Sequence, residues 1–175
     1  MVRYQRPVFG LIVRMVRDRE LAEDLGQEVF LKAFRALESY DPRRRFSSWL
    51  FKIAHNATID YLRRGTLQTV SLSNAGEEHG GLEDTLEDPL VRSPGQSVER
   101  ADLAQALEGA IARLRPGYRE VILLRHREEL SYREIADITG SSLGTVKTNI
   151  HRARKELAGM LRSSRGLSSD EVSGG

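Results

Sequence analysis

Apolar residues recur along this chain with the spacing of a helix, and no alternating run of apolar and polar residues favours a strand. In the first segment one helical face is formed by Val8, Leu11, Ile12 and Met15. In the second, apolar positions recur every four residues, at Leu21, Leu25, Val29, Ala33 and Leu37, with Phe30 and Phe34 beside them. A third helix is expected from an N-cap at Ser47 to a stop at Gly65, burying Leu50, Ile53, Ala54, Ala57 and Tyr61. These segments predict a small three-helix unit.

The helical period returns in the second half of the chain. One helix is defined by Leu103, Leu107, Ile111 and Leu114 and ends at Pro116-Gly117, and the next carries Tyr118, Val121, Ile122 and Leu124. Ser131 and Glu134 then have the spacing of a capping box. The short helix that follows ends at Gly140, and Ser141 or Ser142 caps a last helix that runs to about Arg162. Its buried face is expected to hold Val146, Ile150, Ala153, Leu157 and Met160.

The segment between the two units has no sustained apolar period. Residues 66–97 are rich in Gly, Ser, Pro and acidic residues, and a structureless span of that length is uncommon inside one compact domain. We therefore expect an all-α chain of two small helical domains, residues 1–65 and 98–162, joined by a flexible acidic linker, 66–97, and followed by a flexible tail, 163–175. The acidic residues either screen the basic domains or are simply solvated.

Composition and charge narrow the possible partners. The chain has 175 residues, 39% hydrophobic and 30% charged, and no Cys, which excludes disulfides, thiolate metal sites and a cysteine nucleophile. No run of apolar residues is long enough to span a membrane, and charges interrupt the N-terminus too often for a signal peptide. Residues 1–64 hold 13 Lys/Arg against 8 Asp/Glu, residues 65–98 hold 1 against 6, and residues 99–162 hold 12 against 9. Two basic blocks around an acidic spacer indicate contact with a polyanion.

The last two helices resemble a DNA-binding helix-turn-helix. Two helices joined by a tight turn that contains Gly make up this unit. The face of the last helix opposite Val146 carries hydrogen-bonding and basic side chains: Gly144, Lys147, Thr148, His151, Arg152 and Lys155, with Thr145 at its margin. Such a face can enter the major groove. The alternative is an ordinary amphipathic helix with a solvated basic face.

The N-terminal unit carries a second candidate DNA surface. Its third helix places Lys52, His55, Asn56 and Arg63 away from Leu50 and Ala57. The segment before it joins cations to rings, at Arg43, Arg44, Arg45, Phe46 and Trp49. Cations that follow phosphates beside rings that stack on unpaired bases suit single-stranded DNA. The alternative is that Phe46 and Trp49 belong to the core and that the arginines are solvated.

Several blocks resemble a known family at this point. Glu23-Asp24-Leu25-Gly26-Gln27-Glu28-Val29-Phe30-Leu31-Lys32-Ala33-Phe34, Phe46–Asn56 and Asp60-Tyr61-Leu62-Arg63-Arg64 resemble conserved region two of bacterial sigma factors. Leu130–Ala136, Gly144-Thr145-Val146-Lys147 and Arg152-Ala153-Arg154 resemble region four. The lack of anything substantial between or before them resembles the extracytoplasmic-function group of RNA polymerase sigma factors.

The resemblance implies a role for each block. The helix with Asp24, Gln27, Glu28, Phe30 and Lys32 would dock on the β′ clamp helices of core RNA polymerase, and region four on the β flap. The loop Tyr40–Ser48 and the helix with Asn56, Arg63 and Arg64 would recognise and melt the minus-ten promoter element. The last helix would read the minus-thirty-five element through Thr145, Lys147, Thr148, His151 and Arg152. Factors of this group act in the cytoplasm, are commonly restrained by an anti-sigma protein, and need no cofactor, metal or small-molecule substrate.

Two other function classes fit the sequence less well. A helix-turn-helix regulator that binds duplex DNA without joining polymerase accounts for residues 131–162 but leaves the N-terminal blocks unexplained. An enzyme is disfavoured because His55, His79, His126 and His151 are scattered without metal-ligand spacing, and no phosphate-binding loop or nucleophile motif is present. We expect no catalytic residue.

Overall fold

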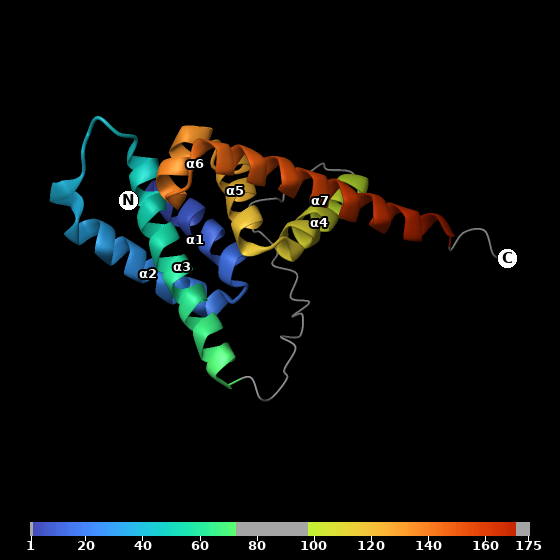
Figure 1. Ribbon diagram of the computed structural model, residues 1–175, viewed down its shortest axis with the longest axis horizontal. Coiled ribbons are helices and arrows are strands. Elements are labelled where there is room, and N and C mark those ends of the chain that lie inside the picture. Colours follow the sequence, from blue (N-terminus) through green and yellow to red (C-terminus); the bar gives the residue numbers. More distant parts are fainter. Residues whose placement is uncertain (1, 73–97, 171–175) are drawn as a thin grey trace.

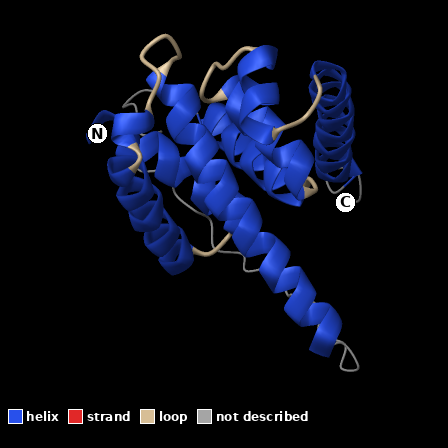
Figure 2. Ribbon diagram, turned by 60° about the vertical axis from the view of Figure 1, so that its left-hand side comes forward, coloured by secondary structure: helices blue, strands red, loops and turns tan. Residues whose placement is uncertain are grey.

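The computed structural model describes residues 2–72 and 98–170, and within these two ranges every regular element is helical and no strand occurs. The elements are α1 (Val2–Val16), α2 (Arg19–Arg35), the 3-10 turn η1 (Leu37–Ser39), α3 (Phe46–Leu72), α4 (Val98–Arg113), α5 (Pro116–His126), α6 (Tyr132–Thr139) and α7 (Leu143–Asp170). Figure 2 shows that short loops join most of them. The predicted all-α fold is confirmed for this part of the chain.

Helices α1, α2 and α3 pack together as the N-terminal module, residues 2–72. The predicted face of α1 is buried, with Val8 and Ile12 fully inaccessible to solvent. Asp18 caps α2 by accepting a hydrogen bond from the Leu21 amide at 3.0 Å, a cap that the sequence pattern did not single out. The buried face of α2 contains Leu25, Val29 and Ala33, as predicted.

Helices α4 to α7 form the C-terminal module, residues 98–170. Pro116 is the first residue of α5, where its missing N–H costs nothing, so it starts a helix as well as following one. The capping box of α6 is present as predicted, and Gly140 ends that helix in the left-handed conformation, with φ of 64°. Val146, Ile150, Ala153 and Leu157 are buried along α7 and Met160 is half-buried.

Some helix ends and core positions differ from the sequence prediction. α3 continues through Gly65 to Leu72, because a glycine weakens a helix by about 1 kcal/mol without necessarily ending it. α7 continues past Arg162 to Asp170. Four residues predicted to be buried are instead exposed, namely Leu37, Tyr61, Leu103 and Leu107, and so is Phe34, which was placed beside the core. The linker was predicted at 66–97 and the tail at 163–175, but residues 66–72 and 163–170 are helical instead of flexible. The rest of both segments, 73–97 and 171–175, lies outside the described residues.

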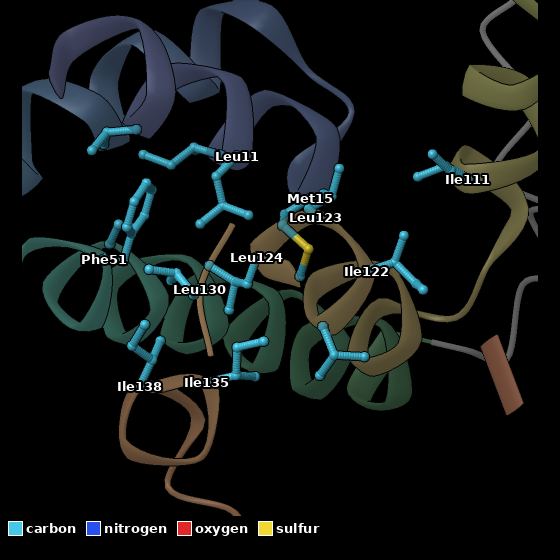
Figure 3. Packing of buried hydrophobic residues seen from close by; sticks show 14 of the residues in the cluster. Leu11, Met15, Phe51, Ile111, Ile122, Leu123, Leu124, Leu130, Ile135 and Ile138 are labelled. Atoms are coloured by element: carbon cyan, nitrogen blue, oxygen red, sulfur yellow. The ribbon is translucent and has the colours of Figure 1, made fainter. Parts of the chain in front are cut away.

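The two modules pack directly against each other. α3 lies beside α6, and α1 lies beside α5 (Figure 1). One continuous apolar cluster joins them: Leu11, Met15 and Phe51 come from the N-terminal module, and Leu123, Leu124, Leu130, Ile135 and Ile138 come from the C-terminal one (Figure 3). The sequence led us to expect two modules connected only by a tether, and the described residues instead form one packed body.

Candidate nucleic-acid and polymerase interfaces

The turn between α6 and α7 fixes the start of the last helix. The Ser142 hydroxyl accepts a hydrogen bond from the Thr145 amide at 3.0 Å and lies 2.9 Å from the Thr145 hydroxyl. Ser142 is therefore the N-cap that the sequence left open between two serines. Thr145 itself is exposed beside this cap, so its position relative to the helix start is set by Ser142.

The outer face of α7 is open to solvent along its first three turns. Every residue predicted to read duplex DNA is exposed there: Thr145, Lys147, Thr148, His151, Arg152 and Lys155. Because Val146 and Ile150 are fully buried on the opposite side, this face cannot rotate inward without breaking the core. The helix thus presents cations and hydroxyls in the arrangement that a major groove accepts.

Further basic and aromatic side chains extend this surface, and the sequence reasoning missed them. A groove of about 380 Å³ is lined by Arg125, Ser131, Tyr132, Arg133, Leu143 and Lys147. The Arg125 guanidinium lies 5.1 Å from the centre of the Tyr132 ring and donates to the Leu130 carbonyl at 2.8 Å. The clue in the sequence was Arg125 before the capping box and Arg133 within it. These groups add positive charge where phosphates flank the groove-reading helix.

A histidine closes the other end of this basic region. His126 lies against the Arg154 guanidinium, with 3.2 Å between Nε2 and the arginine nitrogen. Burial, followed by the charges of Arg154 and Arg125, lowers the pKa of His126 below the ordinary value for histidine. The imidazole is therefore neutral at neutral pH, and its ring nitrogen accepts the hydrogen bond from Arg154.

The loop before α3 is ordered by its own hydrogen bonds. The Tyr40 hydroxyl donates to the Arg44 carbonyl at 2.6 Å, and the Asp41 carboxylate accepts from the Arg43 amide at 3.0 Å. The Arg44 amide also donates to the Asp41 carbonyl at 3.0 Å, which closes a turn. Arg43, Arg44 and Arg45 are exposed on this turn, as a surface that follows phosphates requires.

The rings around this loop contact one another in tilted and edge-to-face arrangements. Phe46 lies 5.3 to 5.4 Å, centre to centre, from Tyr4, Tyr40 and Trp49, and Tyr40 lies 5.3 Å from Trp49. Phe46 and Trp49 are half-buried and pack against the core. In this arrangement Phe46 and Trp49 support the arginine turn from below. Their packing favours the interpretation that they belong to the core, although part of each ring remains exposed.

The predicted DNA face of α3 divides into two parts. Lys52 and Asn56 are exposed on one side of the helix. Arg63 and Arg64 are also exposed, and both bond to Asp60, Arg63 to its carboxylate at 3.1 Å and Arg64 to its carbonyl at 3.2 Å. His55 points elsewhere: its Nδ1 lies 2.5 Å from the carboxylate of Glu120 in α5, and the two side chains are only 12% and 6% exposed.

The α2 residues assigned to polymerase form an acidic surface with an apolar edge. Asp24, Gln27 and Glu28 are exposed, and Lys32 makes an ion pair with Glu28 at 2.5 Å. Phe30 is half-buried and packs against the core instead. Leu31 is 57% exposed and by helical geometry lies between Gln27 and Glu28 on the same face, and Phe34 is 70% exposed at its margin. The sequence pattern placed Phe34 beside the apolar positions of this helix and did not indicate an exposed apolar edge.

Comparison with known proteins gives the family. Residues 1–67 match the family model of sigma-70 region 2, and residues 104–157 match that of sigma-70 region 4. SigW of Bacillus subtilis (strain 168), an ECF RNA polymerase sigma factor, is 37% identical over 163 residues, covering 91% of this chain and 85% of SigW. The chain belongs to the ECF sigma factors. It therefore directs RNA polymerase to promoters and binds DNA through region 4.

Solved structures agree with the fold of this sigma factor. The sigma factor RpoE of Bartonella quintana, crystallised with the anti-sigma factor NepR, has a TM-score of 0.73 at 22% identity, covering 92% of this chain and 93% of RpoE. CnrH, crystallised with the cytosolic domain of CnrY, has a TM-score of 0.62 at 25% identity, and the match covers 93% of this chain and 84% of CnrH. The likeness to RpoE, at 22% identity, supports only the fold, and the likeness to CnrH is consistent with the same fold.

The match to the family excludes the two alternative function classes, a helix-turn-helix regulator that does not join polymerase and an enzyme. The match of residues 1–67 to region 2 accounts for the N-terminal blocks, which a simple helix-turn-helix regulator would leave without a role. Sigma factors are initiation factors and not enzymes, as predicted. Among the residues that the structure describes, no cluster of His, Asp and Glu has the arrangement of a metal site, and no helix is long and apolar enough to cross a membrane.

Proposed function

We propose that the exposed face of α2 is the surface by which this sigma factor joins core RNA polymerase. Asp24, Gln27 and Glu28 are exposed around Leu31, and the carboxylates would meet arginines of the β′ clamp helices while Leu31 is buried between them. This acidic face with an apolar centre is the single observation that carries the proposal. Region 4 would make a second contact, with the β flap.

The promoter would be read by two surfaces. Lys52 and Asn56 of α3, together with Arg43 to Arg45, would recognise and open the minus-ten element, which costs a few kcal/mol for each base taken from the stack. The outer face of α7 would read the minus-thirty-five element through Thr145, Lys147, Thr148, His151 and Arg152. Base contacts of this kind contribute about 1 to 3 kcal/mol each to discrimination.

The setting of this activity follows from the same assignment. Transcription initiation takes place in the cytoplasm, where the chain would act. By analogy with RpoE, which was crystallised with an anti-sigma factor, an anti-sigma protein would restrain it. Neither role requires a cofactor.

The test is a pull-down with purified core polymerase. Asp24→Arg with Glu28→Arg should abolish capture of the enzyme and leave the helical circular dichroism signal unchanged. A charge-matched control carries the same reversals at Glu38 and Asp137, which are exposed outside α2. Capture of core polymerase by the first variant at the level of the control would refute the docking assignment.

A further inference from the structure

A second basic groove lies between the end of α5 and one flank of α7, two helices that pack side by side (Figure 1). This hollow, the Arg154 groove, has a volume of about 400 Å³ and is lined by Arg125, His126, Glu129 and Arg154. Arg125 also lines the groove described above that contains Lys147, so the two grooves adjoin at this side chain. The basic surface beside the DNA-reading helix therefore extends past Lys147 toward the C-terminal part of α7.

Helical geometry places Arg154 on the same flank of α7 as Lys147. The two residues are seven positions apart in this helix, which is about two turns, or about 10 Å along its axis. When the face with Thr148 and Lys155 enters a major groove, a flank of the helix turns toward the phosphates of one DNA strand. Arg154 is exposed, and within the described part of the chain its guanidinium bonds to His126 and pairs with no carboxylate.

His126 is the group of this groove that can change its charge near neutral pH. Its ring nitrogen accepts from Arg154, and the charges of Arg154 and Arg125, added to its burial, hold its pKa below the ordinary value, as described above. Glu129 supplies the carboxylate of the same lining. Among the described residues, α1 and α6, which also pack on α5, contribute no side chain to this lining. The free imidazole is therefore neutral between two cations.

A phosphate of the DNA backbone suits these donors. A guanidinium binds phosphate oxygens through a planar pair of N–H groups, and Arg125 and Arg154 face the groove from opposite helices. The negative charge of the phosphate offsets the two cations, which otherwise disfavour an imidazolium beside them. His126 can then take a proton from solvent, and its Nε2 can donate to the phosphate instead of accepting from Arg154. Two cations and the imidazolium outweigh the single carboxylate of Glu129.

We propose that the Arg154 groove holds a backbone phosphate beside the minus-thirty-five element and that His126 takes up a proton when this phosphate binds. The inference rests on the proposed reading of that element by the outer face of α7, and it adds Arg154 and His126 as residues that position the helix on DNA. Because the imidazole is neutral in the free protein and charged in the complex, promoter affinity rises as the pH falls from about 7.5 to about 6.

The first test compares promoter affinity at two pH values. Holoenzyme made from core polymerase and the full chain binds a duplex promoter fragment at pH about 7.5 and about 6.0, at constant ionic strength. Every protein carries His151→Gln, because His151 is a second exposed histidine on the reading face. With His126 present, affinity should rise about threefold more over this range than with His126→Gln, whose amide oxygen can still accept from Arg154. An equal rise with and without His126 would overturn the proposal.

Calorimetry in two buffers with different ionisation enthalpies counts the protons directly. At a pH of about 6.5, the His151→Gln holoenzyme should take up roughly half a proton more on binding the promoter than the same protein with His126→Gln added. The protons that polymerase itself takes up or releases cancel in this difference. Equal proton uptake by the two proteins would contradict the assignment of His126.

The phosphate itself is tested through Arg154. Arg154→Gln should lower promoter affinity and reduce the salt dependence of binding by about one unit, because one phosphate is no longer neutralised. Arg162→Gln makes the same change at an exposed position farther along α7 and should leave the salt dependence unchanged. A salt dependence of Arg154→Gln equal to that of Arg162→Gln would remove the phosphate from this groove.

Failure of this inference can be told from failure of the proposed function. Lys147→Ala with Arg152→Ala tests whether α7 reads the upstream element at all. If that double variant leaves the footprint over this element unchanged, the reading by α7 is wrong and the phosphate site falls with it. If the double variant loses the footprint while His126→Gln and Arg154→Gln behave like their controls, only the phosphate site is wrong.

Discussion

Arg119 is a buried cation of α5 whose replacement should cost a large part of the stability of the fold. Its side chain is 6% exposed, and within the described residues its guanidinium bonds to carbonyls rather than to a carboxylate: those of Ile111, Ala112, Leu114, Arg14 and Met15, at 2.6 to 3.3 Å. These carbonyls lie at the ends of α1 and α4, where a helix leaves most of its last carbonyls without internal donors; the Ile111 carbonyl also accepts from the Leu114 amide at 3.1 Å. Burial, followed by the charge of Arg17, lowers the pKa of Arg119 to about 10, so it remains protonated at neutral pH.

The magnitude follows from the groups that would be left unpaired. Arg119→Met keeps the length of the side chain and removes every donor, which leaves the buried carbonyls of Ile111, Leu114 and Met15 without this partner. Each such carbonyl costs about 1 to 3 kcal/mol, and release of the buried charge offsets part of the loss. We expect the free energy of unfolding to fall by about 3 to 5 kcal/mol, which is a large share of the stability of a domain this size.

The assay is urea denaturation followed by circular dichroism. Arg113→Met is the control, because Arg113 is an exposed neighbour on α4 with one bond to the Gly109 carbonyl, and its change should stay within about 0.5 kcal/mol. Arg119→Lys, with the charge kept but three donors in place of five, should fall between the two. A loss below about 1 kcal/mol for Arg119→Met would refute the view that this guanidinium fixes two helix ends.

Three further predictions concern the interfaces. Lys147→Ala with Arg152→Ala should lower promoter affinity and reduce the salt dependence of binding by about one unit for each phosphate that these side chains no longer neutralise. Arg162→Ala, an exposed change farther along α7, is the control and should leave both quantities unchanged. Unchanged footprints of the double variant over the upstream element would refute the assignment. Asn56→Ala should impair strand opening more than closed-complex binding, and equal permanganate reactivity of the two proteins would remove Asn56 from that role. The pKa of His126 should lie below 6.5 by NMR, because the fold disfavours the charged form of this side chain. Folding stability is then lost as the pH falls from about 6.5 through the pKa of the folded state. A pKa at or above 6.5 would contradict this prediction.

The sequence was sufficient where an element is decided by its own residues. The capping box at Ser131, the stop at Gly140 and the buried stripe of α7 depend on neighbours within a few positions, and all three are present. Leu103 and Leu107 were misassigned because an apolar face shows only that a helix has something to bury, and not whether the described chain supplies a surface to bury it against.

Residues whose role depends on distant segments could not be found in the same way. Arg119 and Glu120 are charged yet buried, because α5 is covered on several sides by helices from both modules. His55 lies on the polar side of its own helix, and only a partner 65 positions away shows that this side faces α5. The sequence indicated two helical modules, but it could not show which of their residues would contact each other across the boundary.

The apolar cluster shared by the modules also gives their contact a characteristic temperature response. Leu11 and Phe51 on one side and Leu124 and Leu130 on the other are buried together in this cluster (Figure 3). The free energy gained by burying such groups weakens on cooling, since their hydration becomes less unfavourable in cold water. Chilling therefore weakens the contact between the modules while leaving each helix hydrogen-bonded, so the modules are held together less firmly in the cold than at room temperature.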